Sequence, residues 1–94
     1  MLAKKDMNIR TIEERVTFYR PFLLPSVDEM LPPGTYLFET EEEQISSMSM
    51  VAYRRISTTI ALPAIGVDTG TRQVVSIDPS ELTAARARDE LGIE

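Results

Sequence analysis

The side chains that could perform chemistry in this 94-residue sequence are its carboxylates, hydroxyl groups, tyrosines, lysines and arginines. The sequence contains no histidine and no cysteine. Histidine is the most frequent general base and transition-metal ligand in proteins, so its absence excludes Ser-His-Asp and Cys-His catalysis and most zinc sites. Any catalysis must therefore rest on the groups that remain.

The segment VDTGTR, residues 67–72, contains one carboxylate that could be catalytic, Asp68. An aspartate followed by Thr69 and Gly70 after an apolar run resembles the active-site motif of retroviral-type aspartic proteases, in which each subunit of a dimer supplies one carboxylate. In that family the flap, a hydrophobic-glycine segment and the dimer strand all follow the motif. Residues 71–94 leave no room for these parts. An aspartic-protease-like enzyme acting through Asp68 is therefore a remote alternative.

The other interpretation of the same segment is a turn between two strands. Gly70 can take a positive φ, and Asp68 can form a hydrogen bond with the local backbone. Asp, Thr and Gly are common in turns for these reasons, so the sequence favours a turn over a catalytic site.

The segment ETEEEQ, residues 39–44, contains a second group of carboxylates. Hard cations such as Ca²⁺ prefer oxygen ligands, but the spacing of these glutamates matches no calcium-binding loop. Runs of charge are usually solvated, so the simplest interpretation is an exposed acidic turn after a strand. The sequence predicts no metal site and no cofactor.

A third interpretation of these glutamates is a surface that binds a partner protein. Residues 21–52 contain six carboxylates and no lysine or arginine, within a chain of net charge −5. A surface of one sign speeds the encounter with a partner of the opposite sign, and it disfavours binding to a phosphate backbone. We therefore expect a protein partner with a basic surface and no direct binding to nucleic acid. The candidate partner-binding residues are Asp28, Glu29, Glu39, Glu41, Glu42 and Glu43.

The segment YRR, residues 53–55, is the basic counterpart of this acidic block. Its two arginines could contact phosphate, but in an acidic protein arginines more often form salt bridges with neighbouring glutamates.

Several short strands separated by turn residues must hold these side chains. Period-2 alternation and β-branched or aromatic residues predict strands over residues 16–24, 35–41, 55–62 and 72–78. Residues 24–34 form a proline-rich loop, and residues 46–54 fit either a strand or a helix. Residues 1–15 are predicted to be a flexible or irregular tail before a single β-rich domain over residues 16–94.

The clearest local signal is a helix over residues 79–91. Asp78 is a suitable N-cap, Pro79 occupies the first helical position, and Glu81 follows the cap by three residues. Gly92 provides a C-terminal stop. The predicted fold class is α+β: a small antiparallel β-sheet or partly closed β-barrel of about four to five strands, with one C-terminal α-helix.

The bulk composition is typical of a small single-domain globular protein. No apolar run reaches the roughly 20 residues that a membrane span needs, and the N-terminus lacks the apolar region of a secretory signal. The absence of cysteine fits a reducing compartment, so we expect a cytoplasmic protein without a membrane partner. The sequence is compatible with a monomer or a homodimer.

Much of the chain resembles a group of short, uncharacterised alphaproteobacterial proteins. The resemblance rests on "TFYRPFLLPSVDEMLPPGTYLFETEEEQI", on "AYRRISTTIALPA" and on "QVVSIDPSEL", and it covers most of residues 17–82. It implies a compact single domain and supplies no functional residues, because that group has no assigned function.

Two functions remain as expectations from these observations. The first is a non-enzymatic, small acidic module that binds another protein. The alternative is an acidic inhibitor, of the type encoded by phages and mobile elements, that blocks the basic nucleic-acid-binding surface of a host protein.

Overall fold

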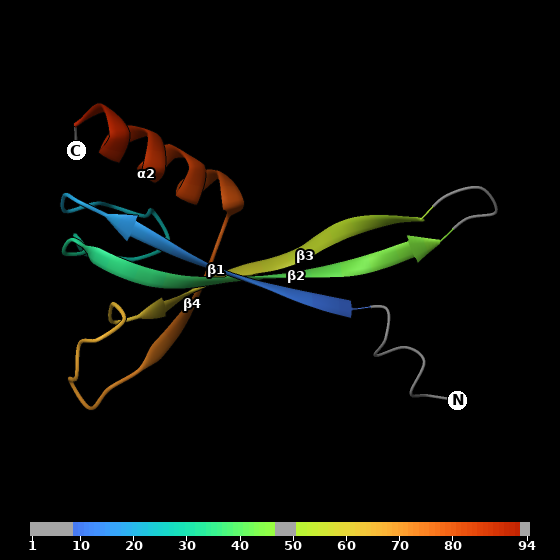
Figure 1. Cartoon of the computed structure of the whole chain (residues 1–94), viewed down its shortest axis with the longest axis horizontal. Helices are drawn as coiled ribbons and strands as arrows, with labels where there is room; N and C mark the ends of the chain where they lie inside the picture. Colours follow the sequence, from blue (N-terminus) through green and yellow to red (C-terminus); the bar gives the residue numbers. More distant parts are fainter. Residues whose placement is uncertain (1–8, 47–50, 93–94) are drawn as a thin grey trace.

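Residues 9–46 and 51–92 are described by a computed structural model, in which four strands are followed by one helix (Figure 1). The strands form one antiparallel sheet in the order β1-β2-β3-β4, and the sheet is open, with β1 and β4 at its edges. The predicted α+β class, a small antiparallel sheet with one C-terminal helix, is confirmed. The elements are β1 (Ile9–Phe18), β2 (Gly34–Ser46), β3 (Val51–Leu62), β4 (Gln73–Ile77) and α2 (Pro79–Leu91).

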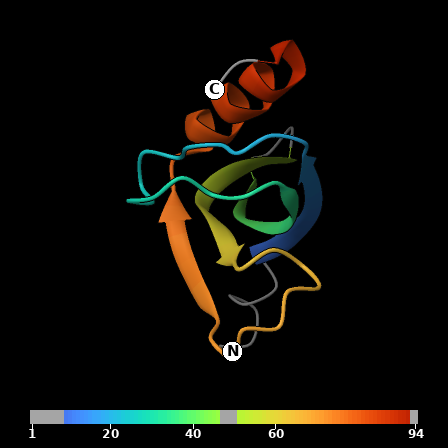
Figure 2. The same ribbon diagram turned by 90° about the vertical axis from the view of Figure 1, so that its left-hand side faces the viewer.

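One face of the sheet carries the hydrophobic core, and we call it the inner face. Side chains alternate between the two faces of a strand, so every second residue contributes to this core. The loop between β1 and β2 crosses the inner face, and α2 lies beyond that loop (Figure 2). The loop supplies Phe22, Leu24 and Leu31 to the core, and the helix supplies Ala85. The sheet contributes Val16, Phe18, Tyr36, Phe38, Ile60, Leu62 and Ile77.

Three aromatic rings fix the loop against the sheet. Phe22 stacks on Phe18 with ring centroids 3.7 Å apart, and Tyr36 meets both rings edge-on. The hydroxyl group of Tyr36 donates a hydrogen bond to the carbonyl of Pro32 at 2.6 Å, and burial raises the pKa of this phenol. The buried hydroxyl group therefore has a partner, as buried polar groups require.

Helix α2 begins with the capping box that the sequence predicts. The side chain of Asp78 accepts a hydrogen bond from the backbone N–H of Ser80 at 2.9 Å, and the side chain of Glu81 accepts one from the N–H of Asp78 at 3.0 Å. Gly92 ends the helix with φ 77°, and its N–H bonds to the carbonyls of Arg88 and Asp89. The predicted boundaries, residues 79–91, are confirmed.

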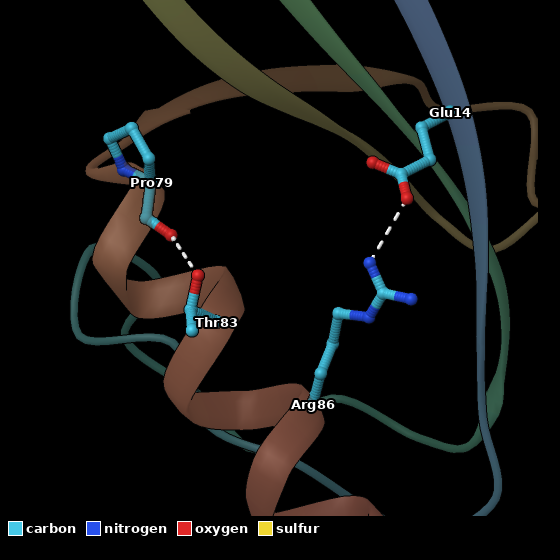
Figure 3. Close-up of polar contacts among 4 residues, drawn as sticks. All are labelled: Glu14, Pro79, Thr83 and Arg86. Carbon is cyan, nitrogen blue, oxygen red and sulfur yellow. Dashed lines mark hydrogen bonds and ion pairs between the residues drawn. The ribbon is translucent and has the colours of Figure 1, made fainter.

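Polar contacts attach the helix to β1 and to the loop that follows it. Arg86 forms an ion pair with Glu14 of β1 at 3.0 Å, on the face of the helix that Figure 3 shows turned toward the strand. The carboxylate of Asp89 accepts hydrogen bonds from the backbone N–H groups of Tyr19 and Arg20. The helix is therefore fixed by its polar face as well as by Ala85.

The first three strands extend well beyond the core. Their far ends project away from α2 (Figure 1), and the molecule measures 46 × 32 × 20 Å. We call this projection the arm and define it as residues 9–13, 40–46 and 51–57. The register of β3 against β2 shifts between Glu41 and Glu42, which leaves Ile56 as an extra residue. The arm exposes the large apolar residues Ile9, Ile12, Ile45, Val51, Tyr53 and Ile56.

Three predictions about the elements are wrong in part. The irregular tail predicted over residues 1–15 is contradicted for residues 9–15, which belong to β1, whereas residues 1–8 lie outside the described part. The strand predicted over residues 16–24 ends at Phe18. The acidic turn predicted over residues 39–44 is instead part of β2, which continues to Ser46.

The strand structure of residues 9–15 and of the end of β2 was not predicted for the same physical reason in both segments. Both faces of the sheet are exposed to solvent there, so the sequence lacks the apolar-polar alternation that marks a half-buried strand. The ambiguous segment 46–54 is strand at Ser46 and from Val51 onward, and residues 47–50 lie outside the description. Within the described residues, no helix has the length and apolar character needed to cross a membrane.

Candidate functional site

The face of the sheet opposite the core carries a group of neighbouring carboxylates, and we call this face the outer face. Glu13 of β1 lies directly opposite Glu39 of β2, and Glu41 follows two residues further along the same face. Glu13 and Glu41 are exposed, and Glu39 is half-buried. We call these three residues the acidic triplet. Hydroxyl side chains lie opposite its members on the neighbouring strands: Thr11, Ser57 and Thr59.

The acidic triplet is electrostatically unfavourable. The pKa of Glu39 is raised by a hydrogen bond with the Glu13 side chain, then by desolvation and by the charges of Glu13 and Glu41. Like charges directly opposite each other on two strands destabilise a sheet. A cation placed between Glu13 and Glu39 would remove this repulsion, so the triplet is suited to receive a lysine or arginine side chain.

The other two glutamates of this segment are already paired with arginines. Glu43 lies on the outer face and forms an ion pair with Arg54. Glu42 points to the inner face and bonds to Arg10 at 2.8 Å, and the guanidinium of Arg10 also lies 3.5 Å from the centre of the Tyr53 ring. Arg54 of the YRR segment therefore forms a salt bridge with a neighbouring glutamate, as the sequence suggested.

The six predicted partner-binding residues do not form one surface. Glu39, Glu41 and Glu43 share the outer face, but Glu42 lies on the opposite one. Asp28 and Glu29 lie in the loop, beside Leu62 and Gln73 at the other end of the sheet. Glu29 also borders a pocket with Tyr36 of β2. Glu43 lies seven residues beyond Tyr36 in the same strand, which is about 24 Å at the rise of a β-strand.

Glu13 is the member of the triplet that sequence reasoning missed. It lies in a segment predicted to be irregular, and its neighbour Glu39 is 26 positions further along the chain. Only the register of β1 against β2 brings the two carboxylates together. Among the described residues, no group of three or more histidine, cysteine, aspartate or glutamate side chains is arranged to hold a metal ion.

Asp68 lies in the exposed loop between β3 and β4. Gly70 has φ 76°, as the turn interpretation requires. The side chain that contacts the backbone of this loop is that of Thr69, which accepts a hydrogen bond from the N–H of Thr71 at 3.3 Å and donates one to its carbonyl at 3.1 Å. This local geometry favours a turn, with Thr69 in the role expected of Asp68.

Comparison of the chain with protein-family models, with curated proteins and with solved structures gave no match.

Proposed function

We propose that the protein is a non-enzymatic interaction module that binds the basic surface of a partner protein through the acidic triplet on its outer face. The observation that carries this proposal is the position of Glu13 directly opposite Glu39, which raises the pKa of Glu39. Native proteins tolerate an unfavourable local arrangement most often where it serves a function. Here a cationic side chain of the partner would relieve the repulsion on binding.

The surroundings of the triplet fit a flat protein interface. Core side chains occupy the inner face, so the outer face can be polar without loss of packing. Its described charges are the acidic triplet, the Glu43–Arg54 pair and Arg15, and they leave the face net negative. A net negative face attracts lysine and arginine and repels a phosphate backbone, which favours a protein over nucleic acid as the partner.

The test is an affinity capture from a native bacterial lysate with three forms of the protein. The first is the wild type, and the second replaces the triplet by Glu13→Gln, Glu39→Gln and Glu41→Gln. The matched control, Asp28→Asn with Glu29→Gln and Glu42→Gln, removes three charges elsewhere. We expect the wild type and the control to retain the same basic protein and the triplet variant to lose it, as measured by quantitative mass spectrometry.

Equal capture by the triplet variant would show that the outer face is not the binding surface. The identity of the partner would also separate the two functional classes. If it is a nucleic-acid-handling protein whose nucleic acid is displaced by this chain, the function is that of an acidic inhibitor. The lack of cysteine supports our proposal that the protein acts in the cytoplasm.

A further inference from the structure

The backbone of β1 directs a regular series of hydrogen-bonding groups away from the sheet. The carbonyl of Thr35 in β2 accepts a hydrogen bond from Ile65, which follows β3, so Thr35 points toward the β3 side. The backbone groups of a strand alternate between its two sides, so the N–H and C=O groups of Tyr36 point toward β1 and form hydrogen bonds with its partner Val16. The N–H and C=O groups of the even-numbered residues of β1 therefore point toward β2. The residues whose N–H and C=O groups point outward are Ile9, Thr11, Glu13, Arg15 and Thr17.

This outer edge of β1 is open over its described length. The order of the sheet places β1 at the edge, with β2 as its neighbour. Five consecutive residues, 15–19, line a groove of about 400 Å³ between β1 and the Arg86–Glu90 side of α2. A groove lined by consecutive strand residues runs along the backbone, so the helix leaves this part of the edge accessible. Beyond it, the outward N–H of Tyr19 is bonded to Asp89.

We propose that the edge of β1 pairs antiparallel with β1 of a second copy of this chain, about a two-fold axis at Ile12. Such a contact is isologous, because each copy uses the same strand. The inner-face residues then form close, non-hydrogen-bonded pairs. Arg10 of each copy lies opposite Glu14 of the other, and Ile12, which is 41 % exposed in one copy, lies opposite its own equivalent.

The outward backbone groups match in the same register. Ile9 lies opposite Arg15 of the second copy, and Thr11 lies opposite its Glu13. All four are residues whose N–H and C=O groups point outward, so these pairs can exchange hydrogen bonds. On the outer face the register sets Glu13 against a threonine instead of another carboxylate. The backbone hydrogen-bonding pattern therefore permits this alignment, and the side-chain charges favour it.

The neighbouring registers are less favourable. A two-fold axis at Glu13 sets Glu13 against its own equivalent, and one at Glu14 does the same for Glu14. An axis at Thr11 leaves both Arg10 and Glu14 without an opposite charge among the described residues. Like charges directly opposite on paired strands are destabilising, whereas opposite charges stabilise the pair.

The intramolecular ion pairs extend into the proposed contact. Arg86 holds Glu14 at 3.0 Å, and Glu42 holds Arg10 at 2.8 Å. Pairing at Ile12 joins them into an alternating row of Arg86, Glu14, Arg10 and Glu42, in which the last two residues belong to the second copy. The free edge of β3 over residues 51–57 is less suited to pairing, because the extra residue Ile56 interrupts it. The occupant that the β1 edge fits is therefore a second copy of the chain.

A single introduced cysteine tests the alignment, because the chain has none of its own. With Ile12→Cys, the two sulfur atoms lie on opposed residues of a close pair, within the reach of a disulfide. With the control Ile9→Cys, the charged pairs of the contact are kept, but the two cysteines are six positions out of register and beyond that reach. We expect mild oxidation to give a covalent dimer with Ile12→Cys and little with Ile9→Cys. Equal cross-linking of the two variants would overturn the register.

Analytical ultracentrifugation of the full chain tests the dimer itself. We expect a concentration-dependent dimer in the wild type. Thr11→Pro removes an outward N–H and leaves the bonds with β2 in place, so it should raise the Kd about tenfold or more, since the two copies lose two hydrogen bonds. Thr11→Val keeps the N–H and should stay close to the wild type. A circular-dichroism melt of each variant monitors folding. A wild type that is monomeric at every concentration, or a dimer that Thr11→Pro leaves unchanged, would overturn the proposal.

Discussion

At the scale of single residues, Glu39 is a carboxylate in an electrostatically unfavourable environment. The hydrogen bond with Glu13 and the neighbouring charges raise its pKa in the folded protein. A carboxyl group with a raised folded pKa binds more protons in the native state than in the unfolded state. Its contribution to stability therefore falls as pH rises through the folded value, and the native state carries the repulsion at neutral pH.

We therefore expect Glu39→Gln to raise the Tm at pH 7, because it removes a charge and keeps the hydrogen-bonding side chain. The gain should shrink as the pH is lowered toward the range in which Glu39 is protonated in the wild type. Thermal melts of both proteins between pH 4 and pH 7 measure this difference. The control is Glu29→Gln, an exposed loop glutamate, which should change little across that range. A variant that is less stable at pH 7 would contradict the electrostatic description of the triplet.

A second prediction at the scale of single residues concerns Asp68. We expect Asp68→Asn to leave the Tm nearly unchanged, because the loop backbone is held by Thr69. We also expect neither protein to cleave a broad peptide library. Cleavage by the wild type that is lost in Asp68→Asn would show that the turn interpretation is wrong. Thr69→Val is the informative companion, because it removes the hydroxyl group that bonds to Thr71 and should lower the Tm slightly.

At the scale of elements, α2 depends on two carboxylates at its start. Hydrogen bonds from the backbone N–H and the hydroxyl group of Ser80 lower the pKa of Asp78. Desolvation alone would raise the pKa of Glu81, but hydrogen bonds from Ser26 and Asp78 outweigh it and lower that pKa. Carboxylates with lowered folded pKa values stabilise the protein above their unfolded values, and this stability is lost as pH falls through the folded values.

We expect Asp78→Ala to lower the Tm at pH 7 by about 5 °C, because the first turn loses its side-chain acceptor. The difference from the wild type should narrow as the pH falls below the ordinary aspartate value of about 4 and through the lowered folded pKa of Asp78. Asp78→Asn retains an acceptor oxygen and should lose less. Differential scanning calorimetry over this pH range provides the measurement, and an Asp78→Ala curve that parallels the wild type at every pH would contradict the capping role.

The contrast between α2 and β1 shows what the sequence could predict. The helix was predictable to the residue because its cap, its first proline and its terminal glycine lie within 15 positions of one another, 78–92. Strand β1 was not predictable in this way, because its residues 9–15 are exposed on both faces and form a strand only by pairing with β2. The acidic triplet was missed for the same reason. Its two opposing members, Glu13 and Glu39, meet only through that non-local register.

At the scale of the whole molecule, the core and the arm have separate roles. The aromatic rings of Phe18, Phe22 and Tyr36, with α2, stabilise one end of the sheet. This packed end fixes the positions of β1 and β2. The pairing of the two strands then extends from this end through the acidic triplet into the arm. A surface held by paired strands loses little conformational entropy on binding, which favours a flat, charged docking face.

The most direct test of the proposed function is the rate at which the captured partner associates with the outer face. Surface plasmon resonance would compare the wild type, the triplet variant and the control variant that lacks the charges of Asp28, Glu29 and Glu42, at low and high salt. Exposed charges act mainly on encounter and are screened beyond about 8 Å at physiological ionic strength. We predict that the triplet variant associates more slowly at low salt and loses most of the salt dependence, while the control keeps it. An association rate and a salt dependence that are unchanged in the triplet variant would contradict the proposal that Glu13, Glu39 and Glu41 form the docking site.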